Sequence, residues 1–598
     1  MINDTLAMLR DRNIEINLND IPLDDPETFQ LFSEKGTVGI FQFESSGMKE
    51  NLARLQPERI EDLIAMNALY RPGPMEMIGT YIARKHGQEK IEYLHESLRP
   101  ILEETYGTIV YQEQVIRIAS DVAGFSLGKA DVLRRAMGKK KLEEMQKQKG
   151  EFIQGAVAHG VDAAAAAAIY DYVEKFASYG FNKSHAAGYA LVAYQTAYLK
   201  VHYPVEFMAA SLTSERDNTK RIVLLKEECR RLKIPLYPPD VNRSFDQFTV
   251  ENGGIRFGLS AVKNVGAAAV EQIVQGRERL GVYRTLFDLA ERVDPQKVNR
   301  KVLESLIQAG ACDSLEGHRA QQKAALDDVM KYAQAVRDDR DRGQESLFGG
   351  EIEAQPLTRP PLPQIEPWSD VETQMLEKEA LGFFLSAHPL DSFRLEAASF
   401  SQLPFSELEQ AADGQPIRLV GFVSDLRRNP DKKGRQMAFI TLSDYTGSVE
   451  VIFFADALEK FGEIVQKDAT LVVEGRCSTR ENDEVKVIAE DVLPLNTART
   501  RLTHGLQVHL NRSRTGPEVI HKLEQICFQH PGSVPLYLRV TGGDHADHRY
   551  RADRYKLQLT DRLLSRLELL VGEGNVTLLA PPPKHPESRN GPYRNNHR

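Results

Sequence analysis

Met437-Ala-Phe-Ile-Thr-Leu-Ser-Asp444 alternates apolar and polar residues, which is the pattern of a half-buried β-strand. Similar segments lie on either side of it, at residues 417–423, 448–454, 470–475 and 484–489. Turn sequences such as Asn429-Pro430 and Thr446-Gly447 separate these segments, and Ala455–Phe461 has the pattern of a short helix. Five strands with a helix between the third and the fourth predict an OB-fold barrel over residues 415–495.

Basic and aromatic residues gather at the first hairpin of this barrel. Arg427 and Lys433 lie in or beside its turn, and Phe439 lies on the strand that follows. A positive groove lined with aromatic rings binds unpaired nucleic acid strands. The alternative, a core aromatic beside a solvated basic loop, is about as frequent for any single residue. We expect Arg427, Lys433 and Phe439 to contact single-stranded DNA.

The composition is that of a multidomain globular protein. The 598 residues are 41% hydrophobic and 27% charged, with a net charge of −9, so any basic surface must be local. We find no apolar run long enough to cross a membrane and no secretory signal. The four cysteines lie far apart and form no CxxC pair, which argues against disulfides and a cysteine zinc site. These features predict a cytoplasmic protein with no membrane partner.

Residues 90–235 have helical periodicity and contain a basic stretch. Lys129–Lys149 holds eight lysines and arginines against three acidic residues. Arg134 and Arg135 precede Lys139 by one helical turn, and guanidinium groups beside an ammonium group suit a polyphosphate. A solvated helix face is the alternative for any such charged run.

A second polar and aromatic cluster reads Tyr179-Gly-Phe-Asn-Lys183-Ser-His185. Tyr179, Lys183 and His185 offer stacking and hydrogen bonding within seven residues. The alternative is a capped helix start with a satisfied histidine. Because the Arg/Lys-rich and Tyr/His-rich segments lie in one helical region, we favour a nucleotide pocket.

Two further segments suggest binding to DNA and to a partner. Lys263-Asn264-Val265-Gly266 precedes a helix, and such a tight turn leaves backbone N–H groups for a phosphate, as in a helix-hairpin-helix motif. Gln344-Glu-Ser-Leu347-Phe348 lies between a charged run and a proline-rich stretch, and Leu347 with Phe348 is expected to be a docking element. An ordinary helix connector and a local hydrophobic contact are the respective alternatives. Near the N-terminus, Val38–Glu44 alternates and predicts a short strand.

Together these motifs resemble one family. Phe41-Gln-Phe-Glu, Ala68-Leu-Tyr-Arg-Pro-Gly-Pro, Tyr111-Gln-Glu-Gln, Ala130-Asp-Val-Leu-Arg-Arg-Ala-Met-Gly-Lys-Lys and Tyr179-Gly-Phe-Asn-Lys-Ser-His-Ala occur in the order typical of the catalytic alpha subunit of bacterial DNA polymerase III, a C-family replicative polymerase. The resemblance is to its C-terminal half. The error-prone paralogue of that family is a weaker match.

The resemblance implies a multidomain α+β protein with mainly helical fingers, a tandem helix-hairpin-helix, a five-stranded OB-fold barrel and a small α/β C-terminal domain. The expected boundaries are fingers at 1–235, helix-hairpin-helix at 236–318, a linker at 319–380 holding the clamp-binding peptide 344–348, a connector at 381–414, the OB-fold at 415–495, a tau-binding domain at 500–580 and a disordered tail at 581–598.

The resemblance also implies roles for residues. Arg135 would contact the triphosphate of an incoming dNTP, Tyr179 and His185 would line its pocket, and Arg134, Lys139 and Lys183 are second choices. The helix-hairpin-helix residues 263–266 would hold the phosphates of template-primer DNA. Gln344, Leu347 and Phe348 would dock on the sliding clamp (beta). The clamp-loader tau subunit would bind the C-terminal domain, and a proofreading subunit would bind only through an N-terminal domain missing here.

One departure from the family concerns catalysis. The family holds two Mg²⁺ ions with palm aspartates, and the PHP and palm domains are absent from this sequence. The sole Asp-x-Asp here is Asp339-Arg-Asp341, in a charged stretch without strand character. We therefore expect no catalytic residue and no metal ligand in this chain, and no activity from it alone. The function is either DNA-templated DNA synthesis in chromosomal replication, as part of a DNA-directed DNA polymerase, or non-catalytic binding of DNA and clamp.

Overall fold

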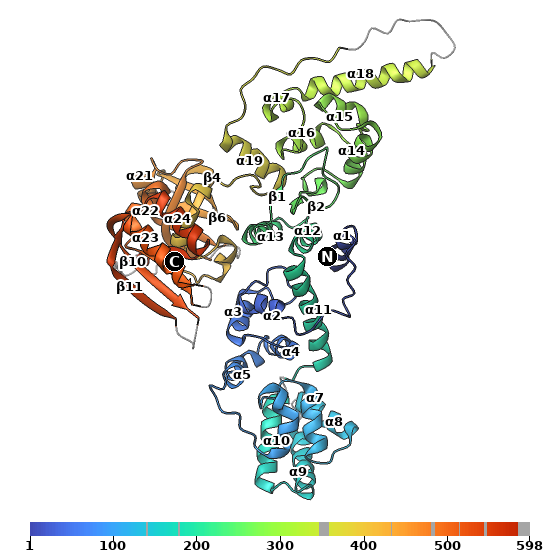
Figure 1. Ribbon diagram of the computed structural model, residues 1–598, viewed down its shortest axis with the longest axis vertical. Helices are drawn as coiled ribbons and strands as arrows, with labels where there is room; N and C mark the ends of the chain where they lie inside the picture. Colours follow the sequence, from blue (N-terminus) through green and yellow to red (C-terminus); the bar gives the residue numbers. More distant parts are fainter. Residues whose placement is uncertain are drawn as a thin grey trace. The chain divides into compact units, whose positions relative to one another are not determined.

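The computed structural model describes residues 1–138, 142–177, 180–345, 358–431, 433–479, 485–512, 515–542 and 547–583. The chain forms two compact units (Figure 1). Unit 1 comprises residues 1–261 and 265–283, and unit 2 comprises residues 262–264 and 284–598. Each unit is described by itself.

Unit 1 begins with short helices packed around a long one. They are α1 (Ile2–Arg10), α2 (Pro26–Ser33), α3 (Ser46–Leu55), α4 (Ile60–Leu69) and α5 (Ile78–Lys85). The long helix α11 (Lys183–His202) packs on α2 and α4, and Figure 1 shows α4 beside it. Asn182 caps α11, because its side chain accepts a hydrogen bond from the backbone N–H of His185 at 2.8 Å.

A helical bundle lies between α5 and α11 in sequence. Its members are α6 (Arg99–Leu102), α7 (Gln112–Asp121), α8 (Leu127–Gly138), α9 (Leu142–Ala158) and α10 (Ala163–Ala177). Apolar residues at helical spacing, among them Ile118, Leu133, Phe152 and Ile169, are fully buried in its core.

The rest of unit 1 continues the helical pattern and adds a small sheet. It contains α12 (Pro204–Ser214), α13 (Thr219–Arg231), β1 (Leu236–Tyr237), β2 (Thr249–Glu251), β3 (Gly254–Arg256) and α14 (Ala267–Leu280). The strands pair in the order β1-β3-β2.

Unit 2 opens with helices and continues into the barrel. The helices are α15 (Leu286–Arg292), α16 (Arg300–Gln308), α17 (Arg319–Ala324), α18 (Leu326–Glu345), α19 (Asp370–Leu381) and α20 (Arg394–Phe400). The barrel contains β4 (Pro416–Pro430), β5 (Gln436–Ser443), β6 (Ser448–Phe453), α21 (Ala455–Phe461), β7 (Thr470–Ser478) and β8 (Lys486–Pro494). In the residues that the structure describes, these five strands close in the order β4-β5-β6-β8-β7, so the predicted OB-fold is confirmed.

The C-terminal part of unit 2 is a mixed α/β domain. It contains α22 (Leu495–Leu502), β9 (Gly505–Asn511), α23 (Pro517–Phe528), β10 (Pro531–Thr541), β11 (His548–Leu557), α24 (Asp561–Val571) and β12 (Val576–Leu579). Its strands pair in the order β11-β10-β9-β12. All four cysteines of the chain are buried thiols.

Two expectations for secondary structure are wrong. Residues 319–345, expected to be linker, form α17 and α18, because Leu326, Val329 and Ala333 make a fully buried stripe on the otherwise charged α18. Asp339-Arg-Asp341 therefore lies on a helix. Val38–Glu44 forms turns instead of a strand, because Gln42 adopts a left-handed backbone conformation with φ of +65°.

Candidate nucleotide and nucleic-acid interface

Gln112, at the start of α7, contacts both clusters that the sequence assigns to a nucleotide pocket. Its Nε2 donates to the carbonyl oxygen of Gly180 at 3.0 Å, and its Oε1 accepts from Nη1 of Arg134 at 3.0 Å. Its backbone N–H donates to the carbonyl oxygen of Phe181 at 2.9 Å. One glutamine thus holds the basic helix α8 and the start of α11 together.

Arg134 and Arg135 differ in their bonded partners and in the exposed fraction of their side chains. Arg134 is bound by Asp131, with Nη2 to Oδ1 at 2.8 Å, as well as by Gln112, and 22% of its side chain is exposed. Arg135 pairs with Oδ2 of the same Asp131 at 2.7 Å, but 66% of its side chain is exposed. The hydrogen bond from Arg134 holds the pKa of Asp131 below its usual value. Of the two guanidinium groups, that of Arg135 is the more exposed, and that of Arg134 has the larger number of bonded partners.

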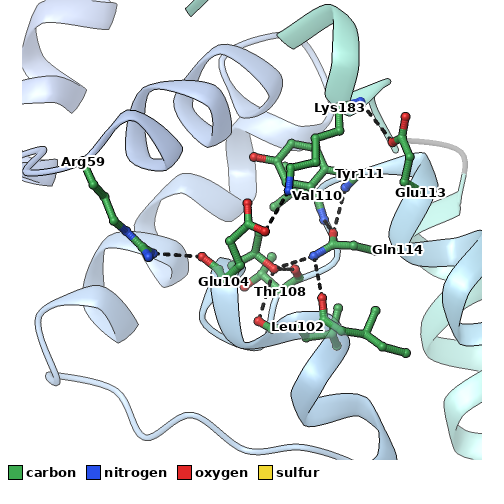
Figure 2. Close-up of polar contacts among 11 residues, drawn as sticks. Arg59, Leu102, Glu104, Thr108, Val110, Tyr111, Glu113, Gln114 and Lys183 are labelled. Atoms are coloured by element: carbon green, nitrogen blue, oxygen red, sulfur yellow. Dashed lines mark hydrogen bonds and ion pairs between the residues drawn. The ribbon is translucent and has the colours of Figure 1, made fainter. Parts of the chain in front are cut away.

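Lys183 is engaged by carboxylates, as Figure 2 shows. Its Nζ forms an ion pair with Glu104 at 2.8 Å, and its backbone N–H donates to Glu113 at 3.0 Å. Close by, the side chain of Gln114 accepts hydrogen bonds from the backbone N–H groups of Val110 and Tyr111. This network fixes the start of α11, so Lys183 has a structural role in addition to any contact with a ligand.

His185 is exposed and lies in a row of aromatic rings. Its ring centroid lies 4.4 Å from that of Tyr189 and 5.4 Å from that of Phe181. The capped helix start of the alternative interpretation is present, because Asn182 caps α11, while the ring of His185 is exposed and contacts other rings. Lys139 and Tyr179 lie outside the described residues.

Some hydrogen-bond donors of the predicted helix-hairpin-helix turn are already bonded to other parts of the protein. The backbone N–H of Lys263 donates to the carbonyl oxygen of Ala380 at 2.9 Å, and its Nζ donates to that of Glu379 at 3.0 Å. Asn264 has a φ of +67° and donates from Nδ2 to Oγ of Ser305 at 3.0 Å.

On the other side of the turn, Val265 is buried with 4% exposure, and Gly266 is the N-cap of α14 with open space beside its Cα. The Lys263 amide was expected to bind a phosphate, but it is already bonded to Ala380 and is not available. The amides at the start of α14 are better placed.

On the barrel, two of the predicted residues are cross-strand partners. Arg427 on β4 lies opposite Phe439 on β5, so their side chains share one face. Arg427 is 60% exposed and donates to Glu450 at 3.2 Å, while Phe439 is half-buried on the outer face. Lys433 is exposed in the turn between the strands, where its backbone N–H donates to Asp431 at 2.8 Å.

The predicted clamp-binding peptide lies only partly within the described residues. Gln344 is the penultimate residue of α18, and Leu347 and Phe348 lie outside the described residues. The proline-rich stretch after it is bonded to the helices before it. Arg359 pairs with Asp288 at 2.8 Å, and Gln321 donates to the carbonyl oxygen of Pro363 at 3.1 Å.

Among the described residues, no group of three or more His, Cys, Asp or Glu side chains lies close enough to hold a metal ion. These residues therefore do not fit Mg²⁺ as a resident cofactor. In the same parts of the chain, no helix is long and apolar enough to cross a membrane.

A helical region with clustered arginines, a helix-hairpin-helix turn and an OB-fold barrel together define a multidomain protein built from nucleic-acid-binding folds. Three family models agree. The bacterial DNA polymerase III alpha subunit finger domain matches residues 1–160, a helix-hairpin-helix motif matches residues 233–322, and an OB-fold nucleic acid binding domain matches residues 417–495.

Curated relatives extend the match along the chain. DNA polymerase III subunit alpha of Pasteurella multocida is 41% identical over 588 residues, which are 97% of this chain and 51% of the relative. The subunit of Escherichia coli K12 is 39% identical over 97% of this chain and 51% of its own length, and that of Thermus aquaticus is 44% identical over 89% and 43%.

Among solved structures, the mitochondrial single-stranded DNA binding protein Rim1 of S. cerevisiae aligns with 14% of this chain at 16% identity and a TM-score of 0.13, too low to bear on fold or function. The chain resembles the C-terminal half of bacterial DNA polymerase III alpha subunits and spans about half the length of the curated relatives it matches. The resemblance to the C-terminal half of that subunit is confirmed, as are the helical fingers and the helix-hairpin-helix.

Sequence reasoning missed Asp131 and Gln112 as site residues. Both fall inside motifs that the sequence singles out, Ala130-Asp-Val-Leu-Arg-Arg and Tyr111-Gln-Glu-Gln. Their presence in those motifs was the available signal. Their partners only become apparent when α7, α8 and the start of α11 are placed together.

Proposed function

We propose that this chain takes part in DNA-templated DNA synthesis in chromosomal replication, as the part of a DNA polymerase III alpha subunit that binds the incoming dNTP and the template-primer DNA. The observation that carries the proposal is the position of Gln112, which bonds the basic helix α8 on one side and the start of α11 on the other. The exposed Arg135 extends from this junction.

A triphosphate carries about four negative charges, and guanidinium groups bind phosphate in a bidentate manner. Arg135 pairs with Asp131 at the edge of the junction, while His185 offers a ring face on the first turn of α11. The arrangement suits a nucleotide whose phosphates lie towards α8 and whose base lies towards α11.

The experiment uses a polymerase extended at its N-terminus to the length of the relatives. Arg135→Ala should raise the dNTP KM or lower kcat by about tenfold, since losing one charge-assisted contact costs about 1.5–3 kcal/mol. Arg117→Ala is the matched control, because Arg117 is another largely exposed arginine, on α7, that pairs with Asp121. An unchanged steady-state profile for Arg135→Ala would remove it from the site.

Partners and cofactor follow from the same proposal. The sliding clamp would bind through Gln344, Leu347 and Phe348, the clamp-loader tau subunit through the C-terminal domain, and single-stranded DNA through the OB-fold barrel. Mg²⁺ would be held by a part of the longer protein that this chain does not include, and the proofreading subunit would bind there too. A cytoplasmic location follows the relatives.

The second candidate function is non-catalytic binding of DNA and clamp. It is favoured by the side chains of the described residues, among which no acidic cluster suits a metal ion. Primer extension separates synthesis from non-catalytic binding. A chain that only binds DNA retains its DNA affinity but supports no synthesis, even when it is supplied in its natural assembly.

A further inference from the structure

Phe41 is an exposed aromatic residue in a strongly buried loop. Its side chain is 43% exposed, while its neighbours Ile40 and Phe43 are fully buried. Gln42 between the two phenylalanines has a φ of +65°, a conformation that a residue with a side chain adopts at a cost. The strained turn directs Phe43 into the core and leaves Phe41 at the surface.

The loop is fixed from several sides. Nζ of the fully buried Lys200 donates to the carbonyl oxygens of Gly36 and Val38, both at 2.7 Å. Glu44 accepts from the backbone N–H of Gly39 at 3.1 Å and from Arg221 at 3.0 Å. The exposure of Phe41 is therefore built into the loop and does not reflect loose packing.

Phe41 ends a row of rings along the start of α11. Its centroid lies 5.4 Å from that of Tyr189, with an interplanar angle of 26°. Beyond Tyr189 the row continues through His185 to Phe181, and the guanidinium of Arg71 lies 4.5 Å from the centre of the Phe181 ring. Through Phe181 the row reaches Gln112 and hence the arginines of α8.

The chemistry of this row selects its ligand. An aliphatic or peptide partner needs apolar area but no stacked planes, whereas a nucleobase gains from a flat ring that continues an existing stack. Within the residues described, the row is also bonded to the junction that holds Arg135, where phosphates are expected. A nucleic acid offers a base to the ring at one end of the row and phosphates to the arginines at the other end.

We propose that Phe41 and Tyr189 form a stacking platform for an unpaired DNA base. The proposal rests on the proposed function, since it supplies the DNA. The platform gives the fingers a contact with the template that is independent of the nucleotide phosphates and of the OB-fold barrel.

The test measures binding of the 598-residue chain to a primer-template in which the first unpaired template base is 2-aminopurine, a base whose fluorescence falls on stacking. The wild-type chain should bind and quench. Phe41→Ala should weaken binding about fivefold or more and remove the quenching, and Phe41→Trp should keep both. Phe528→Ala, which truncates a 77% exposed phenylalanine of unit 2, should match the wild type.

Phe41→Leu separates stacking from apolar contact, because it keeps the bulk and removes the ring. If Phe41→Leu binds and quenches like the wild type, or if Phe41→Ala changes neither signal, the platform is overturned while the proposed function stands. If the wild-type chain binds no primer-template at all, the proposed function and the platform fail together. Because Phe41 is exposed, a circular dichroism melt should show every variant folded.

Discussion

Oε1 of Gln112 accepts a hydrogen bond from Nη1 of Arg134 at 3.0 Å, across 22 residues of sequence. The same side chain donates to the carbonyl oxygen of Gly180 at 3.0 Å, across 68 residues. Gln112 therefore positions α8 relative to the start of α11, and the proposed nucleotide site depends on it.

Gln112→Ala should raise the dNTP KM of the longer polymerase by about fivefold while kcat changes less, because Arg135 loses its orientation and not its charge. Gln112→Glu keeps the acceptor for Arg134 but loses the donor to Gly180. Its dNTP KM should therefore lie between that of the wild type and that of Gln112→Ala. Steady-state kinetics measure both. Gln30→Ala is the control, since Gln30 is an exposed residue that bonds Glu34. Equal KM values for Gln112→Ala and the wild type would show that Gln112 positions nothing in the site.

The barrel face supports a prediction about salt. Removing Arg427 and Lys433 together should lower the steepness of log affinity for single-stranded DNA against log salt by about 1.4. Each phosphate contact releases counterions when DNA binds, so a variant with two fewer contacts releases fewer of them. Fluorescence anisotropy between 50 and 300 mM salt, roughly the range over which such contacts are lost, gives the slope.

Arg476→Ala is the matched control for the barrel, since Arg476 is a 46% exposed arginine of β7 that pairs with Glu490. Its slope should equal that of the wild type. Equal slopes for the double variant and the wild type would mean that DNA does not meet this hairpin.

The buried pair of Lys200 and Glu228 should hold the Phe41 loop. Burial lowers the pKa of Lys200 to about 8, against the opposing effect of Glu228. Lys200→Met should weaken the loop by about 3 kcal/mol, the low end for a broken buried pair, because Arg231 still bonds Glu228 at 2.7 Å. Hydrogen exchange of the amides of residues 36–44 measures the loss. Lys35→Ala, which breaks the exposed pair with Glu50, should leave that exchange unchanged.

The same pair predicts a pH dependence. Burial by itself raises the pKa of Glu228, but hydrogen bonds from Arg231 and Lys200 outweigh it, so the native pKa lies below 4.5. A lowered native pKa means that this stabilisation is present above pH 4.5 and is lost as the pH falls through the native value. Loop protection should therefore fall below pH 4.5 in the wild type but not in Glu228→Gln. A pH-independent wild type would contradict the assignment.

How far the sequence predicts the structure differs between regions. The barrel is predictable because each strand alternates apolar and polar residues, and alternation reports which face is buried. The Phe41 loop has the same alternation without a strand, since the left-handed Gln42 and the buried Lys200 act through contacts up to 164 residues away. A contact between residues so far apart in the sequence produces no periodic pattern from which it could be predicted.

The candidate site shows the same limit. Residue types indicate Arg134 and Arg135 as candidate phosphate ligands, but only the structure shows that Asp131 and Gln112 engage Arg134 and leave Arg135 mostly exposed. The helix α18 was missed because a charged surface hides the buried stripe of Leu326, Val329 and Ala333.

Clamp binding should depend on the peptide after α18. Changing Leu347 and Phe348 together to alanine should abolish binding of the chain to a bacterial sliding clamp, because each apolar side chain contributes about 1.5–3 kcal/mol on burial. Surface plasmon resonance on immobilised clamp measures this. Changing Ile352 and Leu357 to alanine in the same stretch should have no effect. If the first double variant retains full affinity, the clamp meets another part of the chain.

Primer extension tests the central claim most directly, namely that this chain contributes DNA and nucleotide binding to a polymerase whose metal ligands lie elsewhere. The purified 598-residue chain is compared with a polymerase extended to the length of the relatives, with Mg²⁺, primer-template and dNTPs. We predict that the chain binds the primer-template without extending it and that the longer protein extends it. Extension by the chain alone that EDTA abolishes, or no extension by the longer protein, would contradict the account.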